Sequence, residues 1–450
     1  MSIYRAYDIR GIYGKDITEE TAENIGKAFG STIEGTVAVG ADCRISSPKL
    51  SEALIKGLAS TGLNVIDVGT VPTPLLYFAI YYLKLDGGVM LTASHNPPEY
   101  NGFKLCKKGG MTLYGEEITA VGAAVDKGIF RAGKGSIQKK DIIQDYIEYV
   151  KERIKINRKV KVVLDCGNGT AGAIAPQLFR ELGCEVIGLF EEPDGMFPNH
   201  PADPTVDANL KDLIAKVKEV GADVGFGYDG DSDRAGFVDE KGGIIRGDQA
   251  LAIFSREILA KHKGAPIIFE VKCSLALKED IENHGGKPIM YRTGHSFIKK
   301  KIKEEHALLA GEMSGHFFFA DDFPGFDDGI YASARMAQII SKSKQRLSEI
   351  VDTIPKYYST PEIKVNAPEA DKFRIVEEVK EEFKKRKDLE VITIDGVRVQ
   401  TKDGWGLLRA SNTGPTLILR FEGRTPEYRD KMRGMFRQAL DRYPQLEGKI

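Results

Sequence analysis

The segment 229–234 places three carboxylates at alternating positions, in the order Asp229-Gly230-Asp231-Ser232-Asp233-Arg234. Carboxylates this close repel one another unless a cation lies among them, and oxygen ligands favour a hard divalent metal such as Mg²⁺. A calcium loop of the EF-hand type is an alternative, because Glu240 falls at the twelfth position of such a loop. However, the sixth position requires glycine and here holds Arg234. A solvated acidic turn is the other alternative, and the sequence favours the metal site.

A serine lies where a predicted strand at residues 87–94 ends, in the segment Thr92-Ala93-Ser94-His95-Asn96-Pro97. A hydroxyl flanked by His95, with Lys104 ten residues further on, could act as a nucleophile or carry a phosphoryl group. The structural alternative is a turn that leads into the two prolines.

Three further loops combine polar groups of several kinds. The segments 311–316 (GEMSGH) and 292–296 (RTGHS) contain a carboxylate, hydroxyls and imidazoles, which could bind sugar hydroxyls and move protons. The segment 409–416 (RASNTGPT) combines an arginine, hydroxyls, an amide and loop N–H groups, which fits a phosphate site and a polar turn equally well.

A glycine-rich segment at 167–172 matches the pattern G-x-G-x-x-G after a predicted strand, with Glu191 and Glu192 downstream. This pattern makes a dinucleotide-binding oxidoreductase an alternative class of protein. The other loops carry metal and phosphate chemistry, which hydride transfer does not need, and the sequence therefore favours phosphoryl chemistry.

The elements that position these loops alternate from residue 1 to about 355 between short apolar runs and amphipathic helical stretches. This alternation is typical of α/β layering. Ser47-Pro48 and Thr73-Pro74 each open a predicted helix, with the hydroxyl residue as its cap. After residue 355 the pattern changes to a helix at 370–386, several strands and a final helix at 426–441. This predicts an α+β unit with an antiparallel sheet.

The composition is that of a soluble globular protein, with 42% apolar residues and a net charge of -1 over 450 residues. The balanced charge argues against nucleic acid or an anionic membrane as a partner. Five cysteines without a C-x-x-C pair indicate neither a disulfide framework nor a thiolate zinc site. The first residues lack an apolar leader, and the longest apolar run, at 71–83, contains two prolines. We therefore expect a cytoplasmic protein.

Four of these motifs, TASHNP, DGDSDR, GEMSGH and RASNTGPT, together with Tyr7–Gly11, make the chain resemble the α-D-phosphohexomutase family along its whole length. The resemblance implies three similar α/β domains with mixed sheets plus a smaller α+β C-terminal domain, around a central cleft. The expected domains are a phosphoserine-loop domain at 1–145, a metal-binding domain at 146–250, a sugar-binding domain at 251–355 and a phosphate-binding domain at 356–450.

The resemblance also implies roles for individual residues. The expected metal set, for one Mg²⁺ per chain, is Ser94, Asp229, Asp231 and Asp233. The expected catalytic set is Ser94, His95, Lys104, Arg10, Arg234, His295 and His316. The expected substrate-binding set is Lys272, Glu312, Ser314, Arg409, Ser411, Asn412 and Thr413. The general acid or base stays open among His316, His295, Lys104 and Arg10.

The function implied by the resemblance is reversible phosphoryl transfer between hexose 1-phosphate and hexose 6-phosphate. It uses a phosphoserine and a hexose 1,6-bisphosphate, which serves as intermediate and activator. The small-molecule partners are then hexose phosphates, and the protein is expected to be a monomer or a homodimer.

Gly414 and Met313 depart from the residues usual in phosphoglucosamine mutases, which favours mannose and glucose phosphates. Glucosamine phosphate, a broader hexosamine specificity and a non-catalytic sugar-phosphate binder remain alternatives. Ala41 replaces an arginine common in the family, although Asp42 and Arg44 are kept.

Overall fold

The computed structural model describes residues 3–411 and 414–446 of the chain. The chain divides into two compact units. Unit 1 consists of Met1–Ala250 and Ser314–Val351, and unit 2 consists of Leu251–Met313 and Asp352–Ile450. In the described part of the chain, no helix is both long and apolar enough to cross a membrane.

The first sheet of unit 1 is mixed, with strand order β1-β5-β4-β2-β3-β7 and β6 beside β5. Strands β2, β3, β4 and β7 are parallel, whereas β5 runs antiparallel to β1, β4 and β6. The strands are β1 (Ile9–Ile12), β2 (Thr36–Ala41), β3 (Asn64–Thr70), β4 (Gly87–Leu91), β5 (Tyr100–Lys107), β6 (Met111–Thr112) and β7 (Ile137–Lys139).

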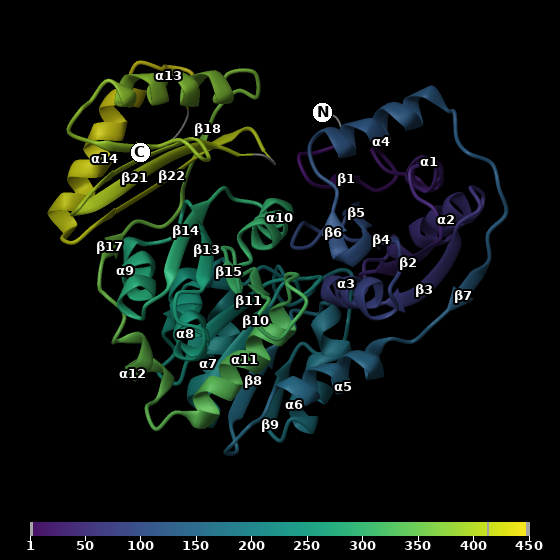
Figure 1. Ribbon diagram of the computed structural model, residues 1–450, viewed down its shortest axis with the longest axis horizontal. Coiled ribbons are helices and arrows are strands. Elements are labelled where there is room, and N and C mark those ends of the chain that lie inside the picture. The colour runs from purple at the N-terminus through teal and green to yellow at the C-terminus, as the bar shows by residue number, and fades with distance from the viewer. Residues whose placement is uncertain (1–2, 412–413, 447–450) are drawn as a thin grey trace. The chain divides into compact units, whose positions relative to one another are not determined.

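Helices cover both faces of this sheet. They are α1 (Glu19–Gly30), α2 (Ser47–Ala59), α3 (Thr73–Tyr82), α4 (Glu116–Lys127) and α5 (Ile143–Arg153). One hydrophobic core joins α1, α2 and α4 to alternate residues of the strands, including Val37 and Val39. The apolar helix α3 lies on the other side of the sheet (Figure 1), where nearly all of its residues are buried. This layering follows from the period of two in strands, which sends alternate side chains to opposite faces.

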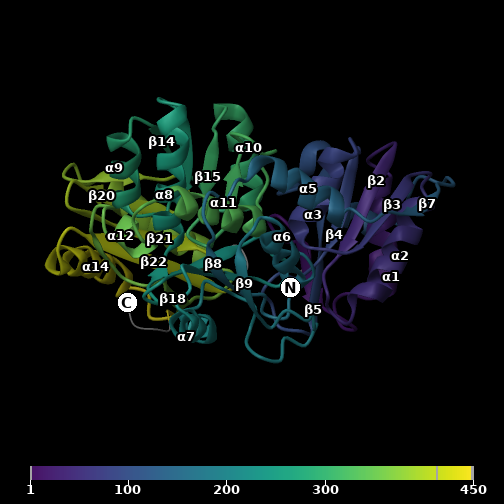
Figure 2. The same cartoon turned by 90° about the horizontal axis from the view of Figure 1, so that it is seen from below.

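The second sheet of unit 1 has the order β12-β11-β10-β8-β9 and is also mixed. Its strands are β8 (Lys161–Asp165), β9 (Glu185–Leu189), β10 (Val224–Tyr228), β11 (Ala235–Asp239) and β12 (Ile244–Ile245). The helices that follow along the chain are α6 (Ala175–Glu181) and α7 (Lys211–Val220), and α8 (Gly247–Lys261) then leads from unit 1 into unit 2. The returning segment of unit 1 adds β16 (Phe317–Phe319), α11 (Gly329–Lys342) and α12 (Leu347–Val351). Helix α5 contacts both α3, which packs on the first sheet of unit 1, and α6, which packs on the second sheet (Figure 2).

Unit 2 begins with three parallel strands in the order β14-β13-β15. They are β13 (Pro266–Glu270), β14 (Lys287–Tyr291) and β15 (Leu309–Gly311), and they alternate with α9 (Leu275–Asn283) and α10 (His295–Glu305). Strand, helix and strand in alternation are what parallel pairing requires.

The rest of unit 2 is an antiparallel sheet with order β17-β22-β21-β20-β19 and with β18 beside β22. Its strands are β17 (Tyr358–Ser359), β18 (Ile363–Asn366), β19 (Glu390–Ile392), β20 (Val397–Thr401), β21 (Gly404–Ala410) and β22 (Thr416–Gly423). Helices α13 (Lys372–Lys384) and α14 (Pro426–Leu440) share one core with this sheet. The predicted antiparallel α+β unit after residue 355 is thus confirmed.

Both predicted helix caps are wrong. Helix α2 begins at Ser47, but the Ser47 hydroxyl donates to Asp42 at 2.7 Å and does not cap the helix. Helix α3 begins at Thr73, whose hydroxyl donates to Asp231 at 2.6 Å. In both cases the hydroxyl donates to a buried carboxylate, and its oxygen does not accept from a backbone N–H of the helix.

Candidate active site

The first sheet of unit 1 brings Arg44, Thr73 and Ser94 to one edge, because each lies just beyond the carboxyl end of a parallel strand. Strands β2, β3 and β4 end at Ala41, Thr70 and Leu91. In α/β sheets, ligands bind at this edge. The loop that carries Ser94 therefore starts from a rigid scaffold.

The three aspartates follow β10, at the corresponding edge of the second sheet of unit 1. Asp229, Asp231 and Asp233 are buried, and one oxygen of each lies within 4.8 Å of the others. The Ser94 hydroxyl donates to Asp229 at 2.6 Å. The Lys104 ammonium, on β5, donates to Asp231 at 2.9 Å and to Asp233 at 2.5 Å. Five of the residues predicted from the sequence thus form one cluster.

The charges in this cluster are not balanced. Burial and the negative charges of Asp231 and Asp233 raise the pKa of Asp229 well above its usual value. Burial opposes the ionisation of Asp231 as well, but the Lys104 ammonium holds the pKa of that carboxyl below its usual value. Burial alone would lower the pKa of Lys104, yet the two carboxylates raise it. Lys104 and the guanidinium of Arg234, which lies 3.8 Å from Asp229, therefore neutralise only part of the negative charge that three ionised aspartates carry.

This cluster fits a divalent cation. Oxygen Oδ1 of Asp231 is buried and has no hydrogen-bond partner, although a carboxylate oxygen away from water needs one. Carboxylate oxygens are the ligands that hard divalent ions prefer. The structure therefore contains an aspartate group that is able to hold a metal ion. It contradicts the EF-hand alternative, because strand β11 follows the loop where a helix would be needed, and Glu240 accepts from Ser348.

Three basic residues surround the serine. Arg10, on β1, donates to Asn96 at 2.7 Å and to Asp8 at 2.6 Å. The guanidinium of Arg234 lies 3.8 Å from Asp229. Nitrogen Nδ1 of His95 lies 3.0 Å from the Ser94 hydroxyl, and burial together with the charges of Arg234 and Arg10 lowers the pKa of His95 to about 3. The His95 imidazole is therefore neutral near pH 7.

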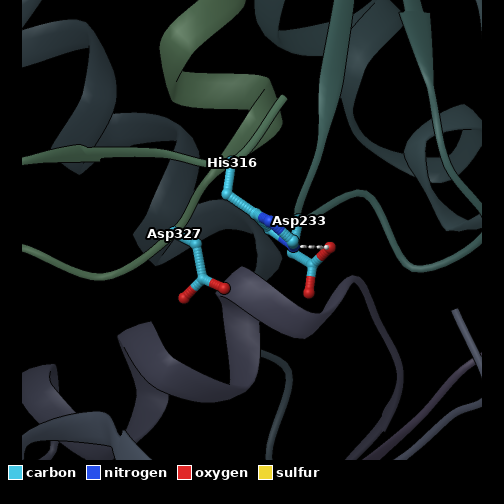
Figure 3. Close-up of side chains that lie close together, drawn as sticks. All are labelled: Asp233, His316 and Asp327. Carbon is cyan, nitrogen blue, oxygen red and sulfur yellow. Dashed lines mark ion pairs between the residues drawn. The ribbon is translucent and has the colours of Figure 1, made fainter. Parts of the chain in front are cut away.

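His316 lies beside the third aspartate (Figure 3). Its Nε2 is 3.2 Å from Oδ1 of Asp233 and 3.2 Å from Nε of Arg234. The first neighbour can only accept a hydrogen bond and the second can only donate one, so Nε2 has a partner with or without a proton. Nitrogen Nδ1 lies 3.0 Å from the Ser314 hydroxyl, and the buried Asp327 lies close to both His316 and Asp233.

Sequence reasoning missed Arg44 as a residue of this site. Its guanidinium is fully buried, pairs with Asp42 at 3.0 Å and donates to the carbonyl oxygens of Ser94, Asn96, Pro97 and Tyr100. These contacts hold the backbone of Ser94, whose φ of +50° is rare outside glycine. Asp42 and Arg44 were recognisable in the sequence as part of a family pattern. Only the fold shows that Arg44 binds the backbone carbonyl oxygens of the Ser94 loop.

The loop around Ser94 also requires Gly230 and Thr73. A Cβ at Gly230 would lie 2.6 Å from the Ser94 carbonyl oxygen, so only glycine permits the close approach of the two loops. Thr73 belongs to the aspartate cluster through its hydrogen bond to Asp231. The sequence offered no signal for this, because Thr-Pro reads as an ordinary helix start.

The glycine-rich segment 167–172 packs against the aspartate loop. The Thr170 N–H donates to the Gly230 carbonyl oxygen at 3.1 Å, and a Cβ at Gly169 would lie 2.9 Å from the same oxygen. A Cβ at Gly172 would overlap the Glu191 carbonyl oxygen. The glycines are therefore explained by close backbone packing, which leaves the dinucleotide interpretation without support.

In unit 2, the parallel strands β13, β14 and β15 bring a second group together at their carboxyl edge. Lys272 pairs with Glu362 at 3.2 Å and lies 3.9 Å from Glu270. The Glu312 carboxylate accepts from the Gly294 N–H at 2.7 Å. Burial raises the pKa of Glu270, which accepts from the Lys272 N–H at 2.8 Å and from the Thr293 hydroxyl at 2.9 Å. Glu270 was not predicted, because a single glutamate at a strand end has no distinguishing pattern.

The remaining predicted residues lie at identifiable positions. Arg409, at the end of β21, pairs with Asp395 at 3.0 Å, and the Ser411 hydroxyl accepts from the Gly414 N–H at 3.2 Å. His295 is the first residue of α10 and belongs to unit 2, whereas Ser314 and His316 belong to unit 1. Asn412 and Thr413 lie outside the described residues.

Comparison with known proteins bears on all of these segments. Models of phosphoglucomutase/phosphomannomutase α/β/α domains I, II and III match residues 1–132, 144–243 and 246–358, and the model of the C-terminal domain matches 362–439. Phosphomannomutase/phosphoglucomutase of Pseudomonas aeruginosa is 48% identical over 443 residues, which cover 98% of this chain and 95% of that protein. Phosphoglucomutase of Neisseria gonorrhoeae is 44% identical over 451 residues, covering 99% and 98%.

A crystal structure of a phosphoglucomutase/phosphomannomutase family protein from Burkholderia thailandensis aligns with a TM-score of 0.93. The two chains are 41% identical, and the alignment covers 99% of each. The fold class is therefore that of the sugar-phosphate mutases with three α/β domains and a C-terminal domain, as the motifs implied. The chain belongs to the phosphoglucomutase/phosphomannomutase family.

Proposed function

We propose that this protein interconverts the 1- and 6-phosphates of mannose and glucose, with Ser94 as the phosphoryl carrier. The observation that carries the proposal is the Ser94 hydroxyl, which lies 2.6 Å from a buried aspartate in a group of three. Relatives at 44–48% identity over nearly the whole chain are named phosphomannomutase/phosphoglucomutase or phosphoglucomutase, which supports the same reaction.

In the proposed reaction, phosphorylated Ser94 donates its phosphoryl group to the free hydroxyl of a hexose monophosphate. The bond between phosphorus and the serine oxygen breaks, a bond between phosphorus and the sugar oxygen forms, and the sugar hydroxyl loses its proton to a base. The product is a hexose 1,6-bisphosphate. Ser94 then takes the other phosphoryl group, and the proton returns to the sugar oxygen. No cofactor is consumed, and the bisphosphate can also phosphorylate an enzyme that has lost its phosphate.

Ser94 is suited to this role by its surroundings. The Ser94 backbone is held by Arg44, and Lys104, Arg10 and Arg234 place positive charge near its hydroxyl. Phosphoryl transfer depends mainly on positioning and on charge stabilisation, so preorganised cations contribute directly to the rate. Asp229, Asp231 and Asp233, with an oxygen on Ser94, would hold one Mg²⁺, which would neutralise charge on the phosphoryl group.

His316 is the best candidate for the proton transfer among the four residues that the sequence left open. Its Nε2 lies between a group that only accepts and a group that only donates, which suits a nitrogen that gains and loses a proton. Lys104 is held as an ammonium by two aspartates, and Arg10 is tied to Asp8. His95 and His295 are proposed to assist binding of the phosphoryl group.

The sugar and its unreactive phosphate are proposed to contact the second group. Glu312 and Ser314 would bind sugar hydroxyls, and Lys272, Arg409 and Ser411, with Asn412 and Thr413, would bind phosphate. A phosphate site that accepts either end of the sugar explains how one serine serves both positions. Contacts to these sugar hydroxyls do not distinguish a hydroxyl from an amino group at carbon 2 of the sugar. Glucosamine phosphate is therefore the second candidate substrate.

The test compares Ser94→Ala with Ser136→Ala, which changes an exposed serine outside the proposed site residues. Purified wild type is first examined by intact mass for one phosphate that Ser94→Ala lacks. Turnover is then measured with glucose, mannose and glucosamine 1-phosphates plus a trace of glucose 1,6-bisphosphate. We expect Ser94→Ala to lose at least about 10³-fold in kcat, while Ser136→Ala matches wild type.

Two results would contradict the proposal. Turnover of Ser94→Ala near the wild-type rate would exclude Ser94 as the carrier. A wild type that binds hexose phosphates without interconverting them would instead identify a non-catalytic sugar-phosphate binder.

A further inference from the structure

The turn between β19 and β20 brings Asp395 to the arginine at the end of β21. Gly396 has a φ of +72°, and a Cβ there would lie 2.3 Å from the Leu408 carbonyl oxygen and 2.8 Å from Cα of Arg409. Only glycine allows the turn to approach β21 this closely. As a result the Asp395 side chain, 11% exposed, meets the Arg409 side chain, 4% exposed.

Oxygen Oδ2 of Asp395 accepts two hydrogen bonds from different parts of unit 2. Nitrogen Nε of Arg409 donates at 3.0 Å, and the backbone N–H of Thr293 donates at 3.1 Å. A hydrogen bond through Nε fixes the orientation of a guanidinium plane. Asp395 therefore orients Arg409 and also fixes the loop after β14.

The next backbone N–H in that loop, from Gly294, donates to Oε1 of Glu312 at 2.7 Å. The two carboxylates thus bind consecutive N–H groups of one short segment. The segment has little freedom, because the Thr293 hydroxyl is anchored on the buried Glu270 at 2.9 Å and Gly294 has a φ of +129°. A change in the position of either carboxylate is transmitted to the other through a single peptide unit.

We propose that Asp395 is a positioning residue that couples Arg409 to Glu312 through the Thr293–Gly294 backbone. The inference rests on the proposed function, which assigns Arg409 to phosphate and Glu312 to sugar hydroxyls. Its consequence is that recognition of the phosphate and recognition of the hydroxyls are one cooperative event. A sugar whose phosphate does not engage Arg409 meets a Glu312 that is less well oriented.

The experiment is a double-mutant cycle between Asp395→Asn and Glu312→Gln, measured as kcat/KM for conversion of glucose 1-phosphate to glucose 6-phosphate. Asparagine keeps the shape of the side chain and removes its charge. We expect Asp395→Asn to lower kcat/KM about tenfold and Glu312→Gln about a hundredfold. If the two residues are coupled, adding Asp395→Asn to Glu312→Gln costs at most about threefold more.

The matched control is Asp388→Asn in the same domain. Asp388 also pairs with an arginine, Arg386, but both side chains of this pair are exposed. We expect Asp388→Asn to change kcat/KM by less than about twofold, alone or with Glu312→Gln. Thermal unfolding of each variant identifies any that do not fold. If Asp395→Asn is among them, Asp395→Ser supplies the same comparison with a smaller side chain.

A folded Asp395→Asn with wild-type kcat/KM would overturn the inference. A double variant whose fold-loss in kcat/KM equals the product of the two single fold-losses would also overturn it, because the effects of independent residues multiply. A general structural defect would give this product as well, since it does not act through Glu312. Failure of the proposed function is distinguishable, since in that case the wild type itself does not convert glucose 1-phosphate.

Discussion

The two polar groups of this protein handle charge in opposite ways. In unit 1, three buried aspartates lie beside Lys104 and Arg234, and Oδ1 of Asp231 has no hydrogen-bond partner. In unit 2, Lys272 is paired with Glu362 and Arg409 with Asp395. The first group has an excess of negative charge and is built to gain a cation. In the second group both cations already have carboxylate partners, and an incoming phosphate has to compete with those carboxylates.

The largest expected effect comes from removing the cation that the first group is proposed to hold. Treatment of the phosphorylated enzyme with EDTA should lower kcat at least about a hundredfold, because the charge on the phosphoryl group is no longer neutralised. Added Mg²⁺ should restore the rate in the wild type and fail to restore it in Asp231→Asn. Full activity in EDTA, with no metal detected by elemental analysis, would contradict the proposal that the first group binds a cation.

The next effect concerns the backbone that carries Ser94. Arg44→Lys should lower kcat roughly tenfold to a hundredfold, because one ammonium cannot replace a guanidinium that contacts four carbonyl oxygens and Asp42. The KM for glucose 1-phosphate should change less than about threefold, since Arg44 belongs to the first group. A variant in which KM rises and kcat is unchanged would contradict this separation of roles.

A smaller effect of opposite sign is expected in the second group. Glu362 is 32% exposed and pairs with Lys272, whose charge holds the pKa of Glu362 below its usual value. Glu362→Gln should free Lys272 for phosphate and lower the KM for glucose 1-phosphate about twofold to threefold at low salt. The difference should disappear at high salt. A raised KM would show that Glu362 positions Lys272 and does not compete with phosphate.

The smallest effect is on stability and concerns a buried carboxyl of unit 1 that is held by uncharged groups. Asp328 accepts from the Tyr146 hydroxyl at 2.8 Å and from the Tyr331 N–H at 2.8 Å, and burial raises its pKa to about 7. The unfolded carboxyl ionises near pH 4. The folded chain therefore binds more protons between these values, and stability falls as the pH rises from about 4 to 7.

Asp328→Asn cannot ionise and should escape this loss. Relative to wild type, the free energy of unfolding of the variant should be about 1–3 kcal/mol larger at pH 8 than at pH 5, as measured by urea denaturation. A difference that is independent of pH would show that the Asp328 carboxyl has the same pKa in the folded and unfolded states.

Much of the fold was predictable because hydrophobic periodicity and strand ends are local properties. The strand predicted at 87–94 is β4, which ends three residues earlier, and the alternation of apolar runs and helices before residue 355 is confirmed. Strands β15 and β16 are short and are separated by the GEMSGH loop. Glycine and polar residues interrupt pairing there, and the interruption places Glu312 and His316 on a loop.

The sequence by itself determined which chemical groups are available and in which order, since Ser94, the aspartates, Glu312 and Arg409 were recognisable as motifs. What it could not determine is which distant residues complete each group. Thr73 reads as a helix cap, Arg44 as a motif remnant, and Asp395 as part of an ordinary turn. Their roles depend on hydrogen bonds to residues 158, 50 and 14 positions away. Such partners come together only when parallel strands and close glycine contacts bring separate loops to one edge, and only the tertiary structure decides this.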